Sequence, residues 1–242
     1  MSQQPFKFKQ FTINQDKCAM KIGTDGVLLG AWTKSTITEE PFNVLDIGTG
    51  TGVISLMIAQ QFASTQIEAL EIDENAFEQA VENFENSPWN DRLFCYHASF
   101  QEFFAEVDDE KYDLIVSNPP FFNASQKSDD KQRNIARFED ALPFEHLLFG
   151  TSKLLSENGT AAFIIPNDQE GKFLQIAEKM HLFPQSITHV QGNANSPIKR
   201  SLIKLSFKKL SHVSSATLIL EKERHIYTED YKKLVKEFYL NL

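Results

Sequence analysis

The sequence VLDIGTGTG at residues 44–52 decides the fold. The apolar run over residues 42–47 predicts a buried strand that carries a carboxylate, Asp46, near its end. Three glycines at alternate positions then predict a turn in which the backbone comes close to a ligand. Residues 53–62 follow as an apolar segment that predicts a helix. A strand, a glycine turn and a helix in this order are typical of the first unit of a nucleotide-binding α/β sheet.

The spacing of the glycines separates this turn from a dinucleotide-binding loop. That loop reads G-x-G-x-x-G and aims a helix N-terminus at a pyrophosphate, whereas the third glycine here comes one residue early. Asp46 would repel a pyrophosphate but suits a cationic or amino-bearing ligand. Asp46, Gly48, Gly50 and Gly52 therefore resemble motif I of the class I S-adenosylmethionine-dependent methyltransferases, whose loop wraps the amino-acid part of the cofactor. A tight turn without a ligand is the alternative.

Length and composition restrict the domain organisation and the cellular location that we expect. The 242 residues are 41% hydrophobic, and we expect one methyltransferase domain with an N-terminal hairpin and cofactor-closing helix over 1–35, a core over 36–210, and a C-terminal strand and helix over 211–242. No apolar run is long enough to span a bilayer and the N-terminus lacks the apolar core of a signal peptide, so we expect no membrane partner. Cys18 and Cys95 suggest no disulfide framework, which favours the reducing cytoplasm.

Charge is divided unevenly along the chain. The net charge is −9, yet residues 171–242 hold 12 Lys+Arg and 6 Asp+Glu, a balance of +6 that leaves −15 for residues 1–170. Such a chain can bind a polyanion locally while it stays acidic overall, so nucleic acid is permitted as a partner. Lys199 and Arg200, in the polar turn 192–201, are candidates for phosphate contacts together with Lys204, Lys208 and Lys209, which follow them. Solubilising charges at the edge of a sheet are the alternative.

A second decisive stretch, YDLIVSNPPF at residues 112–121, runs from a buried strand into Asn118-Pro119-Pro120-Phe121. Two prolines fix φ and remove two backbone donors, so a carbonyl and a side-chain amide can point outward from a rigid turn. The Asn118 oxygen and the Pro119 carbonyl can then hold the two hydrogens of an exocyclic base amine, while Phe121 stacks on the base. The tetrad resembles motif IV of amine-methylating enzymes. A proline turn that merely ends a strand is the alternative.

Cofactor contacts are also predicted downstream of the glycine turn. Glu71 ends an apolar run about 20 residues beyond the turn, where a carboxylate can bind both ribose hydroxyls of a nucleoside. Ile72 would then pack against the adenine. Ser99 and Phe100 follow the strand expected over 92–97. Many relatives have an acid where Ser99 stands, and Phe100 packs either on the adenine edge or in the core.

Upstream of the glycine turn, IGTDGVLLGAW at residues 22–32 predicts a helix that begins at Val27 with Thr24 or Asp25 as its cap. The stretch also resembles motif X of the same methyltransferases, a helix that closes over the methionine end of the cofactor. This resemblance implies cofactor contacts by Lys21, Gly23, Thr24, Asp25 and Leu28. Helix capping alone is the alternative.

The polar segment 122–137 follows the Asn-Pro-Pro-Phe tetrad and carries four basic residues: Lys127, Lys131, Arg133 and Arg137. It is either an RNA clamp beside the reaction centre or a solvated insertion. Beyond it, the pattern predicts a helix over 143–155, a strand over 160–166, a helix over 172–181, an antiparallel hairpin of 186–191 with 202–207, a strand over 216–221 and a helix over 229–240. The six histidines form no metal-ligand spacing, so we predict no metal site.

Six stretches, in order and over nearly the whole chain, resemble the bacterial tRNA (adenine-N6)-methyltransferases of the YfiC type: IGTDGVLLGAW, VLDIGTGTGVISLMIAQ, ALEID, VSNPPFF, NIARFE and YTEDYKKLVKEFYL. The resemblance implies S-adenosylmethionine as cofactor and methylation of N6 of adenine 37 in a valine tRNA. It also implies an α/β, Rossmann-like class I fold: a mostly parallel seven-stranded sheet with an antiparallel closing hairpin and helices on both faces. We expect a monomer.

Two other functions stay open at this point. The first is methylation of another amine, either guanine N2 in ribosomal RNA or a protein glutamine. Glutamine methyltransferases usually add an N-terminal helical domain, and only about forty residues precede the glycine-turn strand here. The second is a non-catalytic RNA-binding protein with this fold, against which the two intact motifs argue.

Overall fold

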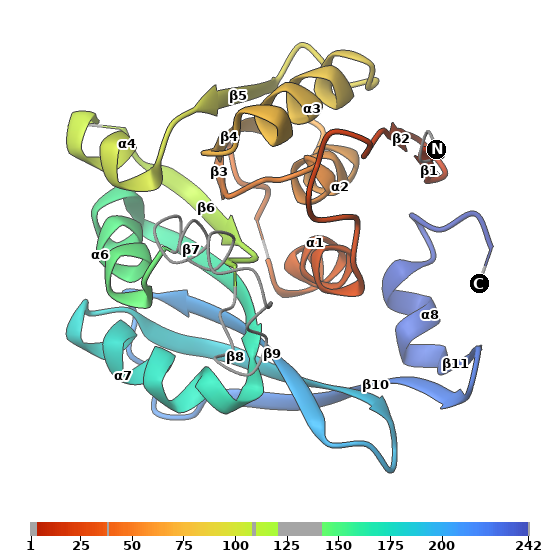
Figure 1. The fold of residues 1–242 in the computed structure, drawn as a ribbon. Helices are drawn as coiled ribbons and strands as arrows, with labels where there is room; N and C mark the ends of the chain where they lie inside the picture. Colours follow the sequence, from red (N-terminus) through yellow and green to blue (C-terminus); the bar gives the residue numbers. More distant parts are fainter. Residues whose placement is uncertain (1–3, 38, 108–109, 121–141, 242) are drawn as a thin grey trace, which may run out of the picture.

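A central sheet with helices on both faces makes up the computed structural model, which describes residues 4–37, 39–107, 110–120 and 142–241 (Figure 1). The strands are β1 (Phe6–Lys7), β2 (Thr12–Ile13), β3 (Asn43–Ile47), β4 (Gln66–Glu71), β5 (Leu93–His97), β6 (Tyr112–Ser117), β7 (Leu155–Pro166), β8 (Phe183–Asn193), β9 (Ile198–Ser206), β10 (Ser214–Glu223) and β11 (Ile226–Tyr227). The helices are α1 (Thr24–Thr36), α2 (Val53–Gln61), α3 (Glu74–Glu85), α4 (Phe100–Glu106), α6 (Phe144–Leu154), α7 (Glu170–Lys179) and α8 (Glu229–Val235).

Strand order places the end of β3 at the centre of the sheet. Within the described residues, nine strands form one sheet in the order β11-β10-β8-β9-β7-β6-β3-β4-β5. The chain passes from β3 outward to β4 and β5, then returns to add β6 on the opposite side of β3, and all these pairs are parallel. In an open α/β sheet, ligands bind beyond the carboxyl ends of the strands where the order reverses. The fold therefore predicts a site beyond the ends of β3 and β6.

The apolar strands bury both of their faces. Val44 belongs to the core cluster under α1, α2 and α8, whereas its neighbour Leu45 belongs to the cluster under α4, α6 and α7. Successive residues of a strand point to opposite faces, so a strand covered by helices on both sides reads as continuously apolar. Figure 1 shows these two helical layers on either side of the sheet. Among the described residues, no helix combines the length and apolar character needed to cross a bilayer.

The predicted class of fold is confirmed, including the antiparallel pairing of β8 with β9. The sheet is wider than the expected seven strands because β10 pairs in parallel with β8 and β11 pairs with β10. Leu218 of β10 is buried in the same cluster as α1 and α8, so this extension covers part of the core.

Two helix boundaries differ from the sequence prediction by three residues or more. α1 begins at Thr24, and Gly23 is its N-cap without any side-chain hydrogen bond. Neither predicted cap is used, because the Asp25 carboxylate accepts a hydrogen bond from Arg200 Nε at 2.7 Å instead. α8 ends at Val235, since Tyr239 pairs with Phe8 in an isolated bridge rather than continuing the helix. The chain termini are joined in this way beside α1.

Candidate active site

The glycine turn after β3 adopts a backbone conformation that favours glycine. Gly48, Gly50 and Gly52 have φ of 72°, 58° and 81°, in the left-handed region. A Cβ on Gly52 would lie 2.5 Å from the Phe84 ring, whereas one on Gly48 or Gly50 would meet nothing within 4 Å. The first two glycines thus leave open space, and the third permits close packing on α3.

The turn is fixed to the end of the neighbouring strand β4. The amides of Gly48 and Thr49 donate to the Leu70 carbonyl at 2.9 and 3.0 Å. The next residue, Glu71, accepts from the Gly50 amide at 2.8 Å and from the amides of Ile72 and Asp73 at 2.9 Å each. Its side chain is 8% exposed. Glu71 is therefore a preorganised carboxylate beside the turn, as a ribose-binding acid would be.

Asp46 lies behind the turn and is fully buried. Its Oδ2 accepts hydrogen bonds from the Thr49 and Ser55 hydroxyls, each at 2.7 Å, while Oδ1 has no partner. Burial raises the pKa of Asp46 to about 6, although the two hydroxyls lower it in part. Asp46 thus supports the turn through Thr49.

The end of β6 lies directly beside the end of β3. Ser117 pairs with Ile47 in the sheet, and its hydroxyl donates to the Ile47 carbonyl at 2.8 Å. Asn118 therefore begins beside Gly48. The Asn118 Oδ1 atom is buried and has no hydrogen-bond partner within the part of the chain that the structure describes. Buried acceptors without a donor are rare in folded proteins, so this atom points to a ligand that donates a hydrogen.

A single cavity of about 270 Å³ joins the two corners. Its wall combines the glycine turn, the end of β4, the Asn-Pro-Pro segment and a stretch that precedes α1. The lining residues include Cys18, Ala19, Met20, Ile47, Gly48, Gly50, Leu70, Glu71, Ile72, Asp73, Ala98, Ser99, Phe100, Ser117, Asn118, Pro119, Pro120 and Leu142. One ligand can therefore contact both Glu71 and Asn118.

Comparisons with known proteins show the family of this chain. Residues 27–143 match the methyltransferase small domain family. The tRNA1(Val) (adenine(37)-N6)-methyltransferase of Christiangramia forsetii is 60% identical over the whole of both chains. The proteins of the same name from Flavobacterium johnsoniae and Bacteroides fragilis are 55% and 47% identical, over 98% and 100% of this chain and the full length of each relative. The chain belongs to the tRNA1(Val) (adenine(37)-N6)-methyltransferase family.

Solved structures support the fold of this family member. A predicted O-methyltransferase from Agrobacterium tumefaciens superposes with a TM-score of 0.68 over 88% of this chain and 96% of its own, at 18% identity. A class I S-adenosylmethionine-dependent methyltransferase from Listeria monocytogenes gives 0.59 over 88% and 69%, at 13% identity. At these identities the likeness concerns the fold alone. The glycine-turn motif implies S-adenosylmethionine as the cofactor.

The cavity fits that cofactor chemically. Glu71 offers a buried carboxylate to ribose hydroxyls, and Ile72, 49% exposed, offers an apolar surface to an adenine ring. The open space at Gly48 and Gly50 admits a ligand close to the backbone. Sequence reasoning placed all four residues at the cofactor, and the fold brings them to one cavity.

Ser99 and Phe100 also line the cavity, where each has a structural task as well. Ser99 is the N-cap of α4, and its hydroxyl and amide donate to the Glu102 carboxylate at 2.7 and 3.2 Å in a capping box. Phe100 is 4% exposed and contacts the Phe104 ring edge-on. Phe100 thus belongs to the core and to the cavity wall, the two interpretations left open by the sequence.

None of the five predicted motif X residues lines the cavity: these are Lys21, Gly23, Thr24, Asp25 and Leu28. Leu28 lies in α1 and is buried in the core that this helix covers. Lys21 donates from its ammonium to the carbonyls of Gln15 and Cys18. Through these bonds Lys21 shapes the preceding segment, which does reach the cavity.

The predicted RNA contacts are only partly within the described residues. Phe121, Lys127, Lys131, Arg133 and Arg137 fall in segment 121–141, outside them. Lys199 is exposed at the start of β9. β9 runs antiparallel to β7 and Arg200 pairs with Pro166, so both basic residues lie at the carboxyl edge of the parallel strands, as the cavity does. Among described residues, no group of three or more His, Cys, Asp or Glu could hold a metal.

Sequence reasoning missed one wall of the cavity. Cys18, Ala19 and Met20 line it although no motif marks them. Ser117 precedes the recognised tetrad by one residue and carried no signal beyond its place at a strand end. Asp73 has two roles. As the N-cap of α3 its Oδ1 accepts a hydrogen bond from the Ala76 amide at 2.8 Å, and the residue also lines the cavity.

Proposed function

We propose that this protein transfers a methyl group from S-adenosylmethionine to N6 of adenine 37 in a valine tRNA. The observation that carries this proposal is that Asn118, whose buried Oδ1 has no hydrogen-bond partner among the described residues, lines the same cavity as Glu71. The names of the full-length relatives supply the substrate. We expect a cytoplasmic enzyme that acts as a monomer.

Asn118 and Pro119 would orient the target amine. An exocyclic amine is a poor nucleophile because its lone pair is delocalised into the ring. The Asn118 Oδ1 and the Pro119 carbonyl each accept one amine hydrogen, which turns the lone pair out of the ring plane toward the cavity. No backbone N–H competes at either proline. Phe121, which follows the corner, is proposed to stack on the base and fix its plane.

Glu71 and the glycine turn would hold the other reactant. When bound, S-adenosylmethionine supplies an electrophilic methyl group on a sulfonium, together with its own leaving group. Glu71 binds the ribose hydroxyls and Ile72 covers the adenine face, while Gly48 and Gly50 leave room for the chain beyond the ribose. The proton released from N6 passes to solvent, so the proposed step assigns no general base to the protein.

Methylation of unmodified total tRNA tests this function. The purified protein is incubated with labelled S-adenosylmethionine and tRNA from a strain that lacks the modification, and the product is digested to nucleosides. We expect the label in N6-methyladenosine, at position 37 of a valine tRNA. Label in N2-methylguanosine, or transfer to a protein glutamine instead of RNA, would contradict the assigned substrate. Absence of any transfer by the folded protein would contradict the enzymatic role.

A further inference from the structure

Residues 14–20, which we call the strap, form the cavity wall that no sequence motif predicted. The strap precedes α1 and lies against α3. Its last three residues, Cys18, Ala19 and Met20, line the cavity, which the glycine turn also borders. Cys18 is 4% exposed, whereas Met20 is 67% exposed. The strap has no regular secondary structure, so side-chain contacts must hold it in place.

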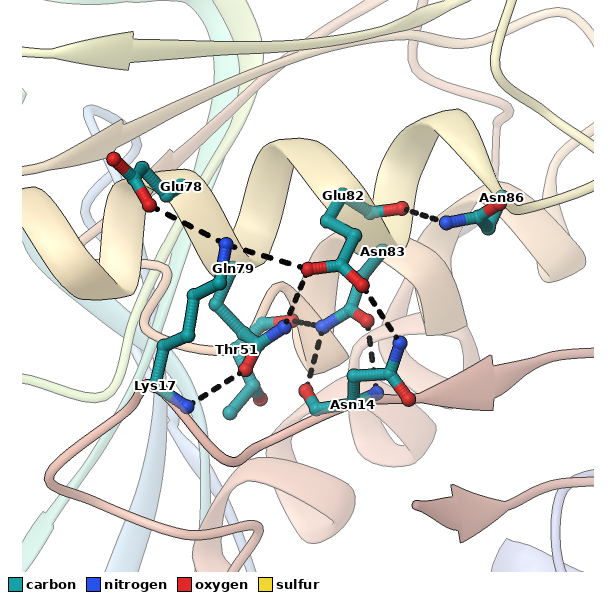
Figure 2. Close-up of polar contacts among 8 residues, drawn as sticks. All are labelled: Asn14, Lys17, Thr51, Glu78, Gln79, Glu82, Asn83 and Asn86. Atoms are coloured by element: carbon teal, nitrogen blue, oxygen red, sulfur yellow. Dashed lines mark hydrogen bonds and ion pairs between the residues drawn. The ribbon is translucent and has the colours of Figure 1, made fainter. Parts of the chain in front are cut away.

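Asn83 on α3 binds the strap and the glycine turn at once (Figure 2). Its Oδ1 accepts from the Asn14 amide at 2.8 Å. Its Nδ2 donates to two carbonyls, that of Asn14 in the strap and that of Thr51 in the glycine turn, each at 2.9 Å. The Asn83 side chain is 1% exposed. Both hydrogens of the amide are therefore used, one on each wall of the site.

Gln79, one helical turn earlier, adds a second buried contact to the strap. Its Oε1 accepts from the Lys17 amide at 3.0 Å, and the residue is fully buried. The Lys17 ammonium also pairs with Glu78 at 3.3 Å and Glu82 at 3.5 Å, but these side chains are 39–55% exposed. Exposed ion pairs contribute little. The two buried amides are thus the main polar attachment of the strap to α3.

We propose that Asn83 is a positioning residue for the cofactor, because it clamps the strap and the glycine turn in the relative placement that binding requires. The inference rests on the cofactor placement proposed above. Thr51 lies between Gly50, which borders the cavity, and Gly52, which packs on Phe84 of the same helix. Without the clamp, the strap is free to leave the glycine turn and the cavity loses one wall.

Asn83→Asp is the sharpest variant. The substitution keeps the size and the acceptor for the Asn14 amide, but it puts an oxygen opposite the carbonyls of Asn14 and Thr51. Asn86→Asp is the matched control: it makes the same change at the C-cap of α3, where the side-chain amide is exposed and, among the described residues, donates only to the Glu82 carbonyl, at 2.7 Å. Figure 2 shows both residues.

Two measurements report on the clamp. Isothermal titration with S-adenosylhomocysteine should show a Kd about tenfold higher for Asn83→Asp, as expected for a buried carbonyl that loses its donor. Maleimide labelling of Cys18 without cofactor should be about tenfold faster, because the thiol is shielded while the strap is closed. Burial raises the pKa of Cys18 to about 11, so at fixed pH an opened strap also increases the reactive thiolate. Asn86→Asp should change neither quantity more than about twofold.

Kinetics separate positioning from catalysis. Asn83→Asp should raise KM for the cofactor and leave kcat at saturating cofactor within about threefold. If circular dichroism shows that Asn83→Asp does not fold, Gln79→Met takes its place with the same expected directions. That variant removes the acceptor for the Lys17 amide and the donor to the Glu82 carboxylate at 3.3 Å. Unchanged Kd and unchanged Cys18 labelling in a folded clamp variant would overturn the inference. Failure of the wild-type protein to bind S-adenosylhomocysteine would instead overturn the cofactor placement.

Discussion

Two residues at this site have buried polar atoms that lower the stability of the fold. Asp46, near the end of β3, and Asn118, just after β6, each have a buried side-chain oxygen without a hydrogen-bond partner among the described residues. Unpaired buried polar atoms cost free energy of folding, of the order of 1–3 kcal/mol each. An interior selected for stability alone would not keep both. For Asn118 the proposed compensation is a hydrogen bond from the target amine. For Asp46 we propose no ligand that would compensate the unpaired oxygen.

The Asp46 carboxyl should make the unliganded protein less stable as the pH rises. Its pKa in the unfolded chain is about 4, and burial raises the pKa to about 6 in the folded protein. Below pH 4 the carboxyl is protonated in both states. Between pH 4 and 6 only the unfolded state releases the proton, so the free energy of unfolding falls, by about 3 kcal/mol at most, and then stays level above pH 6.

Urea unfolding of wild-type protein and Asp46→Asn at pH 4, 5, 6 and 7 checks this prediction. The difference in unfolding free energy between the two proteins should drift in favour of the variant as the pH rises, and stop drifting above about pH 6. Asp91→Asn, at an exposed position, is the control for the general effect of losing an acid. A parallel pH dependence of wild type and Asp46→Asn would rule out the buried ionisation.

At the scale of elements, the glycine turn shows how much a motif can predict. The alternate glycines indicated close backbone approach, and the structure gives all three a positive φ. The sequence could not distinguish their tasks, because the contact of Gly52 with Phe84 depends on how α3 packs on β5 and β4. The strap shows this limit of sequence-based prediction more clearly. Its place depends on Gln79 and Asn83, more than sixty residues away, so no local pattern could reveal it.

Alanine at two of these glycines should therefore have different consequences. Gly50→Ala meets only the cost of a left-handed backbone, about 1–2 kcal/mol, since its Cβ would have no neighbour within 4 Å. Gly52→Ala adds a clash with the Phe84 ring at 2.5 Å, which should cost about 1–3 kcal/mol more. Urea unfolding of both variants measures the difference. Equal losses would show that Phe84 does not pack against the turn as described.

Boundaries were predicted less well than elements. The predicted α1 began three residues late, because the sequence offered two capping side chains and the fold used Asp25 for a bond to Arg200. The predicted α8 was five residues too long, because an apolar periodicity continues through Phe238 while the backbone turns to meet Phe8. In each case a contact between distant parts of the chain overrode a local signal.

At the scale of the whole molecule, charge and sheet topology act together. The basic C-terminal part of the chain contributes β9, whose first residues lie at the carboxyl edge of the parallel strands. A tRNA that delivers adenine 37 to the cavity would approach this edge. The opposite end of β9 leads to Lys209, which pairs with Glu178 at 3.0 Å. An acidic protein can in this way present a basic contact where the proposed substrate arrives.

Lys199→Ala should weaken binding of tRNA and reduce its dependence on salt. Loss of one phosphate contact lowers the slope of log Kd against log salt by about 0.7–0.9. Lys209→Ala, at the opposite edge, is the matched control and should leave the slope unchanged. Fluorescence titration of labelled tRNA at several salt concentrations measures both, and binding of S-adenosylhomocysteine should be equal in the two variants. An unchanged slope for Lys199→Ala would place the RNA elsewhere.

The central claim is that the cofactor and the target amine meet in one cavity, with Asn118 holding the amine. Asn118→Ala tests it most directly, when methyl transfer to tRNA and binding of S-adenosylhomocysteine are measured on the same preparation. We predict that kcat falls at least about 100-fold, the usual effect of losing one preorganised hydrogen-bond partner of the reacting group, while the Kd for S-adenosylhomocysteine changes less than about threefold. Methyl transfer at the wild-type rate by the Asn118→Ala protein would contradict the account.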